Sequence, residues 1–516
     1  MPLPGITFRS VLLALNAAIA LGLAAFAINQ GVLLAVFLWH RRPRRRAATQ
    51  ACPPKVPPSD GGAGNADLPI LPTVTIQVPL YNERYVAQRI IAAVCALDYP
   101  CELLHIQVLD DSTDETTGIA QRGVEAARAN GLSVELIHRT RRDGYKAGAL
   151  ANGLGRTQSE FVGVFDADFV PAEDFLYRIF GSRAAAGARP FDQPEIGFVQ
   201  TRWGFMNRDE NALTRAQALL LDMHFGVDQP ARGDAGLLMN FNGSAGVWRR
   251  DCIEDAGGWQ ADTLTEDLDL SYRVQLRGWR GVYLADYLSP SELPLGIASY
   301  KRQQARWARG SVQCLRKLGP RVLRAQMPFY KRLAGIIHLG GYVTNPLLLL
   351  LALSTPVLMA SARTELTASG WMSAVGLIGL LPILSMFVAH AAQGRSLLAF
   401  LRVLPAAVVL GIGVSLSNTI ALLAGFVNTG VFARTPKGGA GRAAQTTSYV
   451  PRPDWTMWAE LALAIYFLGV SVLLGRAGAW LSVAPLLLYG LSYAGVALGQ
   501  LAVLLKITPG QREARA

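Results

Sequence analysis

Apolar and polar positions divide the chain into membrane and soluble regions. Residues 11–39 form an apolar run without a charged side chain, which is long enough to cross a bilayer with some tilt. Similar apolar runs cover residues 333–360, 371–391, 457–474 and 479–505. The pattern therefore predicts five helical spans, one before and four after a long region of mixed composition.

A further apolar segment, residues 403–427, is interpreted as re-entrant or interfacial rather than spanning. Ser415 and Asn418 place polar side chains in its middle, where contact with lipid would be unfavourable. Basic residues stand on both sides, for example Arg402 and Arg434, and basic residues mark cytoplasmic ends. We therefore expect both ends of this segment on the cytoplasmic side.

The region between the first two spans, residues 73–315, alternates strand-like and helix-like segments. Four short runs rich in β-branched residues are separated by helical stretches, and these runs cover residues 73–79, 104–109, 134–138 and 161–165. Strands that alternate with helices indicate a mostly parallel sheet with helices on both faces. The sequence therefore predicts an α/β domain between the spans.

Two carboxylates, Asp166 and Asp168, follow the fourth of these strands and are separated by one small residue. A buried parallel strand would carry them to the carboxyl-terminal edge of the sheet, where open α/β sheets bind ligands. Hard oxygen ligands at that edge suit Mg²⁺ or Mn²⁺ held against a diphosphate. An acidic turn is the simpler alternative because Asp is common in turns, and these residues alone leave both interpretations open.

Composition supports a membrane protein. Hydrophobic residues make up 51% of the 516 residues and charged residues only 17%, against about 25% in soluble proteins. The net charge of +12 comes from basic clusters beside apolar runs, so it indicates membrane topology and lipid contact rather than nucleic-acid binding. One such cluster, residues 40–46, should stay in the cytoplasm, which predicts an amino terminus outside. The five cysteines show no metal-ligand spacing, which fits a reducing compartment.

Two further candidates for ligand contact lie in the first half of the α/β region. Asp110 and Asp111 follow the second strand, where their carboxylates could bind the ring nitrogen or the hydroxyls of a ligand. Capping of the next helix is the alternative role for this cluster. Lys146 stands among small residues that allow close approach of a ligand, so a phosphate contact is its candidate role, although exposed lysines are common.

The second half of the region carries two more candidates. Glu266 and Asp267 open a helical segment, where a carboxylate could take the proton of an attacking sugar hydroxyl or could simply cap the helix. Gln303, Arg306 and Trp307 lie in a basic, helix-prone stretch. An arginine there could neutralise a leaving diphosphate and a tryptophan could face a sugar ring, whereas interfacial anchoring is the alternative.

Taken in order, these motifs resemble the DD, DxD, TED and QxxRW signature of processive family 2 glycosyltransferases. This family includes the bacterial cellulose synthase catalytic subunit, hyaluronan synthases and chitin synthases. Phe241-Asn242-Gly243-Ser244 is similar to the FxGS-type segment near the family's acceptor, and Phe432, Thr435 and Lys437 resemble the gating loop of cellulose synthase. The wording of the motifs is closest to the cellulose-synthase-like A and C branch of mannan and glucan synthases.

The resemblance implies a GT-A-type, Rossmann-like cytoplasmic domain joined to an α-helical transmembrane region. With the apolar pattern it gives a six-part layout: transmembrane helix 1–42, flexible linker 43–72, catalytic domain 73–315, interfacial helix 316–332, transmembrane region 333–505 with a gating-type loop at 432–442, and cytoplasmic tail 506–516. The implied activity is inverting transfer of a hexose from UDP-glucose or GDP-mannose to a growing β-glycan. The implied location is the inner (plasma) membrane.

The resemblance also gives each site residue an expected role. The donor-binding residues are Asp110, Asp111, Lys146, Asp166, Asp168 and Arg306, with Mg²⁺ or Mn²⁺ held by Asp166 and Asp168. Asp267 is the expected catalytic base, and the acceptor-binding residues are Asn242, Gly243, Ser244, Glu266, Gln303 and Trp307. A non-processive transferase that glycosylates a membrane lipid is the alternative, since few spans suit a lipid acceptor. Accessory export subunits and the choice between the two donors are left open.

Overall fold

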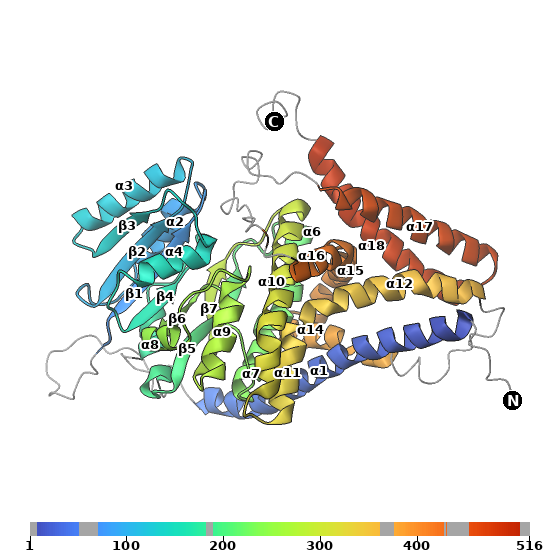
Figure 1. Ribbon diagram of the computed structural model, residues 1–516, viewed down its shortest axis with the longest axis horizontal. Coiled ribbons are helices and arrows are strands. Elements are labelled where there is room, and N and C mark those ends of the chain that lie inside the picture. The colour runs from blue at the N-terminus through green and yellow to red at the C-terminus, as the bar shows by residue number, and fades with distance from the viewer. Residues whose placement is uncertain are drawn as a thin grey trace.

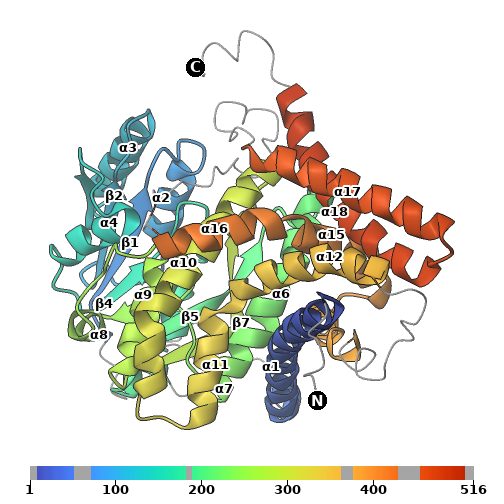
Figure 2. The same cartoon turned by 45° about the vertical axis from the view of Figure 1, so that its right-hand side comes forward.

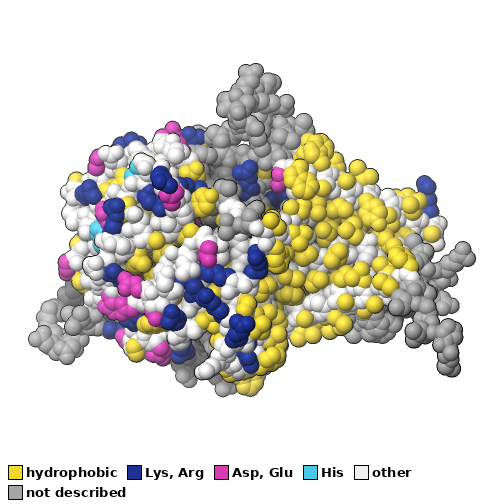
Figure 3. Space-filling view, in the orientation of Figure 1, with side chains coloured by type: hydrophobic (Ala, Val, Ile, Leu, Met, Phe, Trp, Pro, Cys, Tyr) yellow, Lys and Arg dark blue, Asp and Glu magenta, His cyan; other side chains and the backbone are white. Residues whose placement is uncertain are grey.

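The computed structural model describes residues 8–50, 71–181, 189–361, 376–427, 430 and 454–505. A strand-rich domain lies at one end of the molecule, and a group of long helices extends from it (Figure 1). Side chains on the surface change in the same place: charged groups of both signs cover the strand-rich end, whereas the long helices present a continuous apolar face (Figure 3). The division into a soluble and a membrane region therefore has a direct structural counterpart.

Within the described residues, seven strands form one sheet in the order β3-β2-β1-β4-β6-β5-β7. Strand β6 runs antiparallel to both of its neighbours, and the other described pairs are parallel. The strands are β1 (Val74–Leu80), β2 (Leu104–Asp110), β3 (Val134–His138), β4 (Phe161–Val164), β5 (Ile196–Phe205), β6 (Gly246–Arg249) and β7 (Arg280–Ser291). The predicted mostly parallel α/β sheet is confirmed.

Helices cover both faces of this sheet, because its central strands are apolar on both sides. One face packs against α2, α3 and α5, and the other packs against α4, α8 and α9. Their bounds are α2 (Ala87–Cys95), α3 (Thr116–Ala129), α4 (Tyr145–Leu154), α5 (Phe175–Phe180), α8 (Arg250–Asp255) and α9 (Glu266–Leu276), with a short turn η1 at Pro190–Asp192. The sheet is thus buried between two helical layers. The loops at the ends of its strands are not covered by these layers and remain accessible to ligands.

The loops after β1 and β2 are tied together at the carboxyl-terminal edge of the sheet. The backbone N–H of Asn82 donates to Ser112 Oγ at 2.8 Å, and the N–H of Thr113 donates to Asn82 Oδ1 at 2.9 Å. Asn82 has a φ of 54°, in the left-handed region, so the chain turns sharply there. Helix α2 begins after this turn, at Ala87.

The remaining helices include the long apolar ones and others that pack against the strand-rich domain. They are α1 (Phe8–Gln50), α6 (Ala212–Met223), η2 (His224–Asp228), α7 (Gln229–Asp234), α10 (Ile297–Arg324), α11 (Phe329–Leu339), η3 (Gly341–Val343), α12 (Thr344–Ser361), α14 (Leu381–Ala392), α15 (Leu397–Gly413), α16 (Ser415–Val427), α17 (Thr456–Arg476) and α18 (Trp480–Leu505). By length and composition, five described segments could cross a membrane: Ser10–Arg41, Gly341–Leu358, Leu397–Val427, Thr456–Arg476 and Val483–Ala502. The protein is therefore a membrane protein.

Four of these segments agree with four of the five predicted spans. The described part of the predicted span 371–391 is a shorter apolar helix, Gly376–Ala392. The segment 403–427 falls within α15 and α16, two helices that meet at Val414. Helix α16 lies alongside α10 (Figure 2), and its polar side chains Ser415, Ser417, Asn418 and Thr419 are buried in the protein.

Two expected boundaries fall inside helices. Helix α1 runs through Gln50, so the start of the linker expected at residue 43 is helical. Helix α10 continues unbroken past residue 315, because Cys314, Leu318 and Val322 pack into one buried cluster with α9 and α11. The expected interfacial helix 316–332 is thus the end of α10 followed by the start of α11.

A buried ion pair joins the start of α10 to the membrane helices. Lys301 Nζ lies 2.8 Å from Glu460 Oε1 of α17, and their side chains are only 3% and 0% exposed. Lys301 also donates to Thr456 Oγ1 at 2.7 Å and lies 3.5 Å from Asp454 Oδ1. Gln500 of α18 donates to the other oxygen of Glu460 at 3.1 Å. This cluster fixes α10 against α17 and α18.

Candidate active site

A cavity opens at the carboxyl-terminal edge of the sheet, bordered by the loops after β1, β2, β4 and β7 and by helices α4, α9 and α10. Because β6 is antiparallel, the loop that precedes it reaches the same edge. The predicted residues that line the cavity are Asp111, Lys146, Asp166, Asp168, Asn242, Gly243, Glu266, Asp267, Gln303, Arg306 and Trp307. Asp110 and Ser244 are not among the lining residues, and Phe432, Thr435 and Lys437 lie outside the described residues.

The two neighbouring aspartates after β2 have different environments. Asp110 is fully buried, and its carboxylate is occupied by Thr117 Oγ1 at 2.6 Å, His138 Nδ1 at 2.8 Å and the N–H of Ser112 at 3.0 Å. Asp111 faces the cavity and accepts two hydrogen bonds from Arg139, at 2.7 and 2.6 Å. Asp110 therefore shapes the loop from behind, and only Asp111 lies where a ligand can reach it.

Arg142 and Tyr81 form an aromatic–cation pair on the same side of the cavity. The guanidinium carbon of Arg142 lies 3.5 Å from the centre of the Tyr81 ring, and both residues line the cavity. Asp111 lies near this pair, with Arg142 Nε 4.0 Å from its carboxylate. A flat ring flanked by a carboxylate and a guanidinium is suited to a nucleobase and its ribose.

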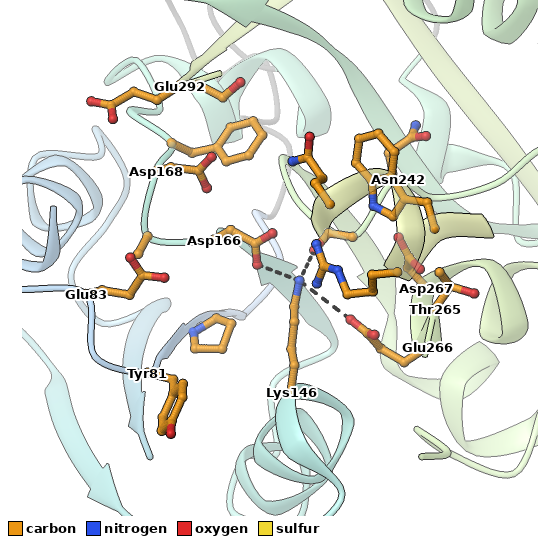
Figure 4. Close-up of a pocket in the computed structure, with 18 of the residues that line it drawn as sticks. Tyr81, Glu83, Lys146, Asp166, Asp168, Asn242, Thr265, Glu266, Asp267 and Glu292 are labelled. Carbon is orange, nitrogen blue, oxygen red and sulfur yellow. Dashed lines mark hydrogen bonds and ion pairs between the residues drawn. The ribbon is translucent and has the colours of Figure 1, made fainter. Parts of the chain in front are cut away.

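Lys146 lies in the middle of the cavity between two groups of acids. Its Nζ lies 2.5 Å from Asp166 Oδ1 and 3.6 Å from Glu266 Oε1, and it donates to the carbonyl of Gly243 at 2.8 Å (Figure 4). Burial by itself lowers the pKa of Lys146, but the carboxylates of Asp166 and Glu266 outweigh it, so the pKa is raised. Lys146 thus stays charged and links the acids from β4 to those from α9.

Asp166 and Asp168 reach the cavity because β4 ends at Val164 in the centre of the sheet. The backbone N–H of Asp166 donates to Ser244 Oγ at 2.9 Å, so Ser244 fixes this turn from beneath. Burial raises the pKa of Asp166, Lys146 opposes the rise, and the negative charge of Asp168 adds to it. Two carboxylates held this close favour a bound cation between them and a phosphate.

Asp267 stands in the first turn of α9 with its carboxylate in the cavity. Burial raises its pKa to about 7, and the neighbouring charge of Glu266 contributes, whereas Lys146 and a hydrogen bond from the N–H of Leu268 oppose the rise. A carboxyl group with a pKa near neutral can accept a proton from a hydroxyl during a reaction.

Gly243 is required where it stands. Its φ is +81°, and a Cβ atom there would lie 2.9 Å from Asp267 Oδ2 and 3.5 Å from Lys146 Nζ. Any side chain would displace the carboxylate of Asp267. The loop before β6 therefore approaches the Asp267 carboxylate so closely that only a residue without a side chain fits at position 243.

The QxxRW residues reach the cavity from α10. Gln303, Arg306 and Trp307 are spaced so that they share one face of a helix, and all three line the cavity. Gln304, which follows Gln303, points to another side of the helix and accepts a hydrogen bond from the Tyr342 hydroxyl at 3.0 Å. One helix thus carries a cation, an amide and an indole to the cavity.

Several lining residues escaped the sequence interpretation, namely Tyr81, Glu83, Arg142, Trp203, Phe169 and Glu292. Tyr81 and Glu83 directly follow β1, so the rule that located Asp166 at a strand end could have found them. Trp203 lies on β5, a strand that the apolar pattern did not reveal. For Trp203 and Glu292 the sequence offered no signal without the sheet order.

Comparisons with known proteins agree with this geometry. Residues 161–432 match the model described as glycosyl transferase family group 2, and residues 75–214 match glycosyl transferase family 2. A probable glucomannan 4-beta-mannosyltransferase 3 from Oryza sativa subsp. japonica is 42% identical over 264 residues, which cover 50% of this chain and 47% of the relative. Glucomannan 4-beta-mannosyltransferase 2 from Arabidopsis thaliana is 42% identical over 269 residues, covering 51% and 48%. The chain spans about half the length of the curated relatives it matches.

Among solved structures, a mannosyltransferase from Pyrobaculum calidifontis in complex with GDP-Man and Mn²⁺ superposes with a TM-score of 0.48 at 23% identity. The superposed region covers 79% of this chain and 99% of the mannosyltransferase chain. The family matches confirm the resemblance to family 2 glycosyltransferases, and with the observed sheet they confirm the expected GT-A-type fold. The larger match covers more than half of the chain. The chain therefore belongs to glycosyl transferase family group 2.

Proposed function

We propose that this protein transfers a mannosyl group from GDP-mannose to the end of a growing β-glycan, with inversion at the anomeric carbon. The observation that carries the proposal is the convergence of Asp166, Asp168, Lys146, Asp267 and Arg306 in one cavity on a membrane protein. The named relatives are glucomannan mannosyltransferases, which favours GDP-mannose over UDP-glucose as the donor. The protein is in this proposal a polysaccharide synthase of the membrane.

The nucleotide would lie on the side of the cavity formed by the loops after β1 and β2. Tyr81 and Arg142 offer a face for the base, and Asp111 offers a carboxylate for a base nitrogen or a ribose hydroxyl. Asp110 takes an indirect role here, because its carboxylate is occupied within the loop. The diphosphate would then extend towards Asp166, Lys146 and the guanidinium of Arg306.

A divalent cation, Mg²⁺ or Mn²⁺, fits the residues present at this diphosphate position. Asp166 and Asp168 are two hard oxygen ligands on one loop, and Mg²⁺ is commonly held by one or two carboxylates together with substrate phosphates. The described residues include no group of three or more side chains that could hold a metal without such help. When bound, the cation would supply charge neutralisation at the leaving diphosphate.

The acceptor would enter from the side of α9 and α10. A hydroxyl oxygen of the glycan attacks the anomeric carbon as the bond to the diphosphate oxygen breaks, and Asp267 takes the hydroxyl proton. Arg306 stabilises the negative charge that develops on the diphosphate. Glu266, Gln303 and Trp307 position the terminal sugar, with the ring of Trp307 as its platform.

For the membrane layout we propose an amino terminus outside, a cytoplasmic catalytic domain at the plasma membrane, and a re-entrant segment at 403–427. The contacts at both ends of α15 and α16 support the last point. Helix α15 packs on α6, α16 packs on α10, and Arg316 donates to the carbonyl of Phe426 at 2.7 Å. Both ends of the segment therefore lie against the catalytic domain, as two cytoplasmic ends would.

The test is transfer by the purified protein in detergent with radiolabelled GDP-mannose or UDP-glucose and a short β-mannan acceptor. We expect polymer labelled from GDP-mannose that a β-mannanase digests. Asp267→Asn, which keeps the shape of the side chain, should lower the rate by about 10²–10⁴-fold. Label confined to an organic-extractable lipid would instead favour a lipid acceptor, and retained activity in Asp267→Asn would refute the assigned base.

A further inference from the structure

The helix that runs from α6 to α7 widens into a π-helical turn, η2, beside the acceptor side of the cavity. The turn covers His224–Asp228 and begins three residues after Leu221, which itself lines the cavity. π-Helical turns are rare and are found frequently at functional sites, because the extra residue redirects neighbouring side chains.

His224 is hydrogen-bonded to a residue that lines the cavity. Its Nε2 lies 3.0 Å from Asn242 Oδ1, and the same oxygen accepts a hydrogen bond from Asn240 Nδ2 at 2.8 Å. Asn240 is in turn held by Gln229, which donates to it at 2.8 and 3.1 Å. Because an amide oxygen carries no hydrogen and can only accept, His224 donates to Asn242 Oδ1 from Nε2.

This arrangement fixes the amide of Asn242 in one orientation. With Oδ1 turned towards His224 and Asn240, Nδ2 is a buried donor, and no described side chain or backbone atom accepts its hydrogen bond. An unsatisfied buried donor costs about 1–3 kcal/mol. A hydroxyl of a sugar bound in the cavity could remove that cost.

The next residue of the turn supports a second lining residue. The ring of Phe225 stacks on Trp203, with ring centres 4.8 Å apart and planes 24° apart. Trp203 lines the cavity and its Nε1 donates to the carbonyl of Ser244 at 3.3 Å. His224 and Phe225 therefore support two side chains of the cavity wall.

We propose that His224 is a positioning residue for acceptor binding, which holds Asn242 so that Nδ2 donates a hydrogen bond to a hydroxyl of the acceptor sugar. The proposal rests on the proposed function, since it assigns this wall to the acceptor. Burial lowers the pKa of His224 to about 4, so the ring is neutral at neutral pH and carries one N–H. That single proton is the one donated to Asn242.

The experiment compares kinetic constants of the purified full-length protein and its variants in detergent. His224→Leu removes the donor, and Asn242→Asp keeps an oxygen for His224 and Asn240 but lacks Nδ2. Each change should raise the acceptor KM about tenfold and leave the donor KM within about twofold, since one hydrogen bond accounts for about 1.4 kcal/mol. His224→Gln keeps an N–H donor and should restore most of the affinity.

The matched control is His105→Gln. His105 lies near the start of β2, at the end of the strand away from the cavity, and does not line the cavity. Its ring is hydrogen-bonded to Ser133 and Glu135. We expect wild-type constants for it. The double variant of His224→Leu and Asn242→Asp should be no worse than either single change, since both break one contact.

Several results would overturn the inference. An unchanged acceptor KM in Asn242→Asp would do so even if His224→Leu failed to fold. A donor KM that rises equally with the acceptor KM, or additive effects in the double variant, would also contradict it. The acceptor constant is measured for whichever acceptor the wild-type protein elongates, so a lipid acceptor serves equally well. A wild-type protein that transfers no sugar would refute the proposed function itself, which separates the two failures.

Discussion

Replacing Lys301 by methionine tests whether the buried ion pair holds the catalytic helix to the membrane helices. The substitution keeps the length of the side chain and removes its charge. Glu460 is then left fully buried with only the amide of Gln500 as a partner, at 3.1 Å. Loss of one member of a buried pair costs about 3–5 kcal/mol, because the other charge stays desolvated without compensation.

The structure also predicts an asymmetry between the two partners. Glu460→Gln leaves Lys301 with Thr456 at 2.7 Å and Asp454 at 3.5 Å, so it should cost less than Lys301→Met. The double variant of Lys301→Met and Glu460→Gln removes both charges and should recover most of the stability lost in the single lysine variant. Thermal unfolding in one detergent, followed by tryptophan fluorescence and by gel filtration, gives the ranking.

Two outcomes would refute this reasoning. A Lys301→Met protein as stable as the wild type would mean that Glu460 carries no charge that needs a partner. A double variant with additive losses would mean that the lysine acts by packing alone. Since α10 also carries Gln303 and Arg306, the destabilised variant should lose transfer activity below its unfolding temperature, whereas the double variant should regain it.

Four further outcomes are expected. The kcat/KM should rise with pH around a midpoint near 7, because burial raises the pKa of Asp267 to about 7 and only the deprotonated carboxylate takes a proton. The same rise of kcat/KM with pH in Asp267→Asn would refute the assignment. Gly243→Ala should reduce kcat at least tenfold, with thermal stability lowered by about 1–2 kcal/mol, because its φ is +81° and its Cβ would meet Asp267. Arg142→Ala should raise the donor KM about tenfold and spare the acceptor KM, as measured by initial rates. Chelation by EDTA should abolish transfer, and Mg²⁺ or Mn²⁺ should restore it in the same assay.

Strands β1, β2 and β4 were predictable because nearly all of their positions are buried, which gives mostly apolar runs in a parallel sheet. Strand β3 has only two buried positions and was recognised from its β-branched residues Val134 and Ile137. Strand β7 escaped because exposed and buried positions mix along its length. Strands β5 and β6 are mostly buried, and a short buried strand cannot be told from a buried helical segment by its apolar pattern alone. The acidic motifs were likewise visible, since Asp166 and Asp168 directly follow such a run. Their meeting with Asp267, 99 positions later, depends on the sheet order, which no local pattern encodes.

The pair Asp110 and Asp111 shows the limit of motif interpretation more sharply. Successive side chains of a strand point to opposite faces, so only one of two adjacent aspartates can face a given cavity. The sequence could not say which one, because that depends on the partners His138 and Arg139 on β3 and just beyond it. The two residues that look equivalent in the chain therefore face different surroundings: Asp110 is bonded within the loop, and Asp111 lines the cavity.

The position of β6 in the sheet has a consequence for biosynthesis. Strands β1 to β4 are complete once Val164 has been made, but β4 pairs on its outer side with β6, which begins at Gly246. At synthesis rates of about 5–20 residues per second, the backbone of β4 stays an open edge for roughly 4–16 s. Open edges recruit other strands. A nascent chain of this protein therefore needs shielding most in that interval, between its fourth strand and its sixth.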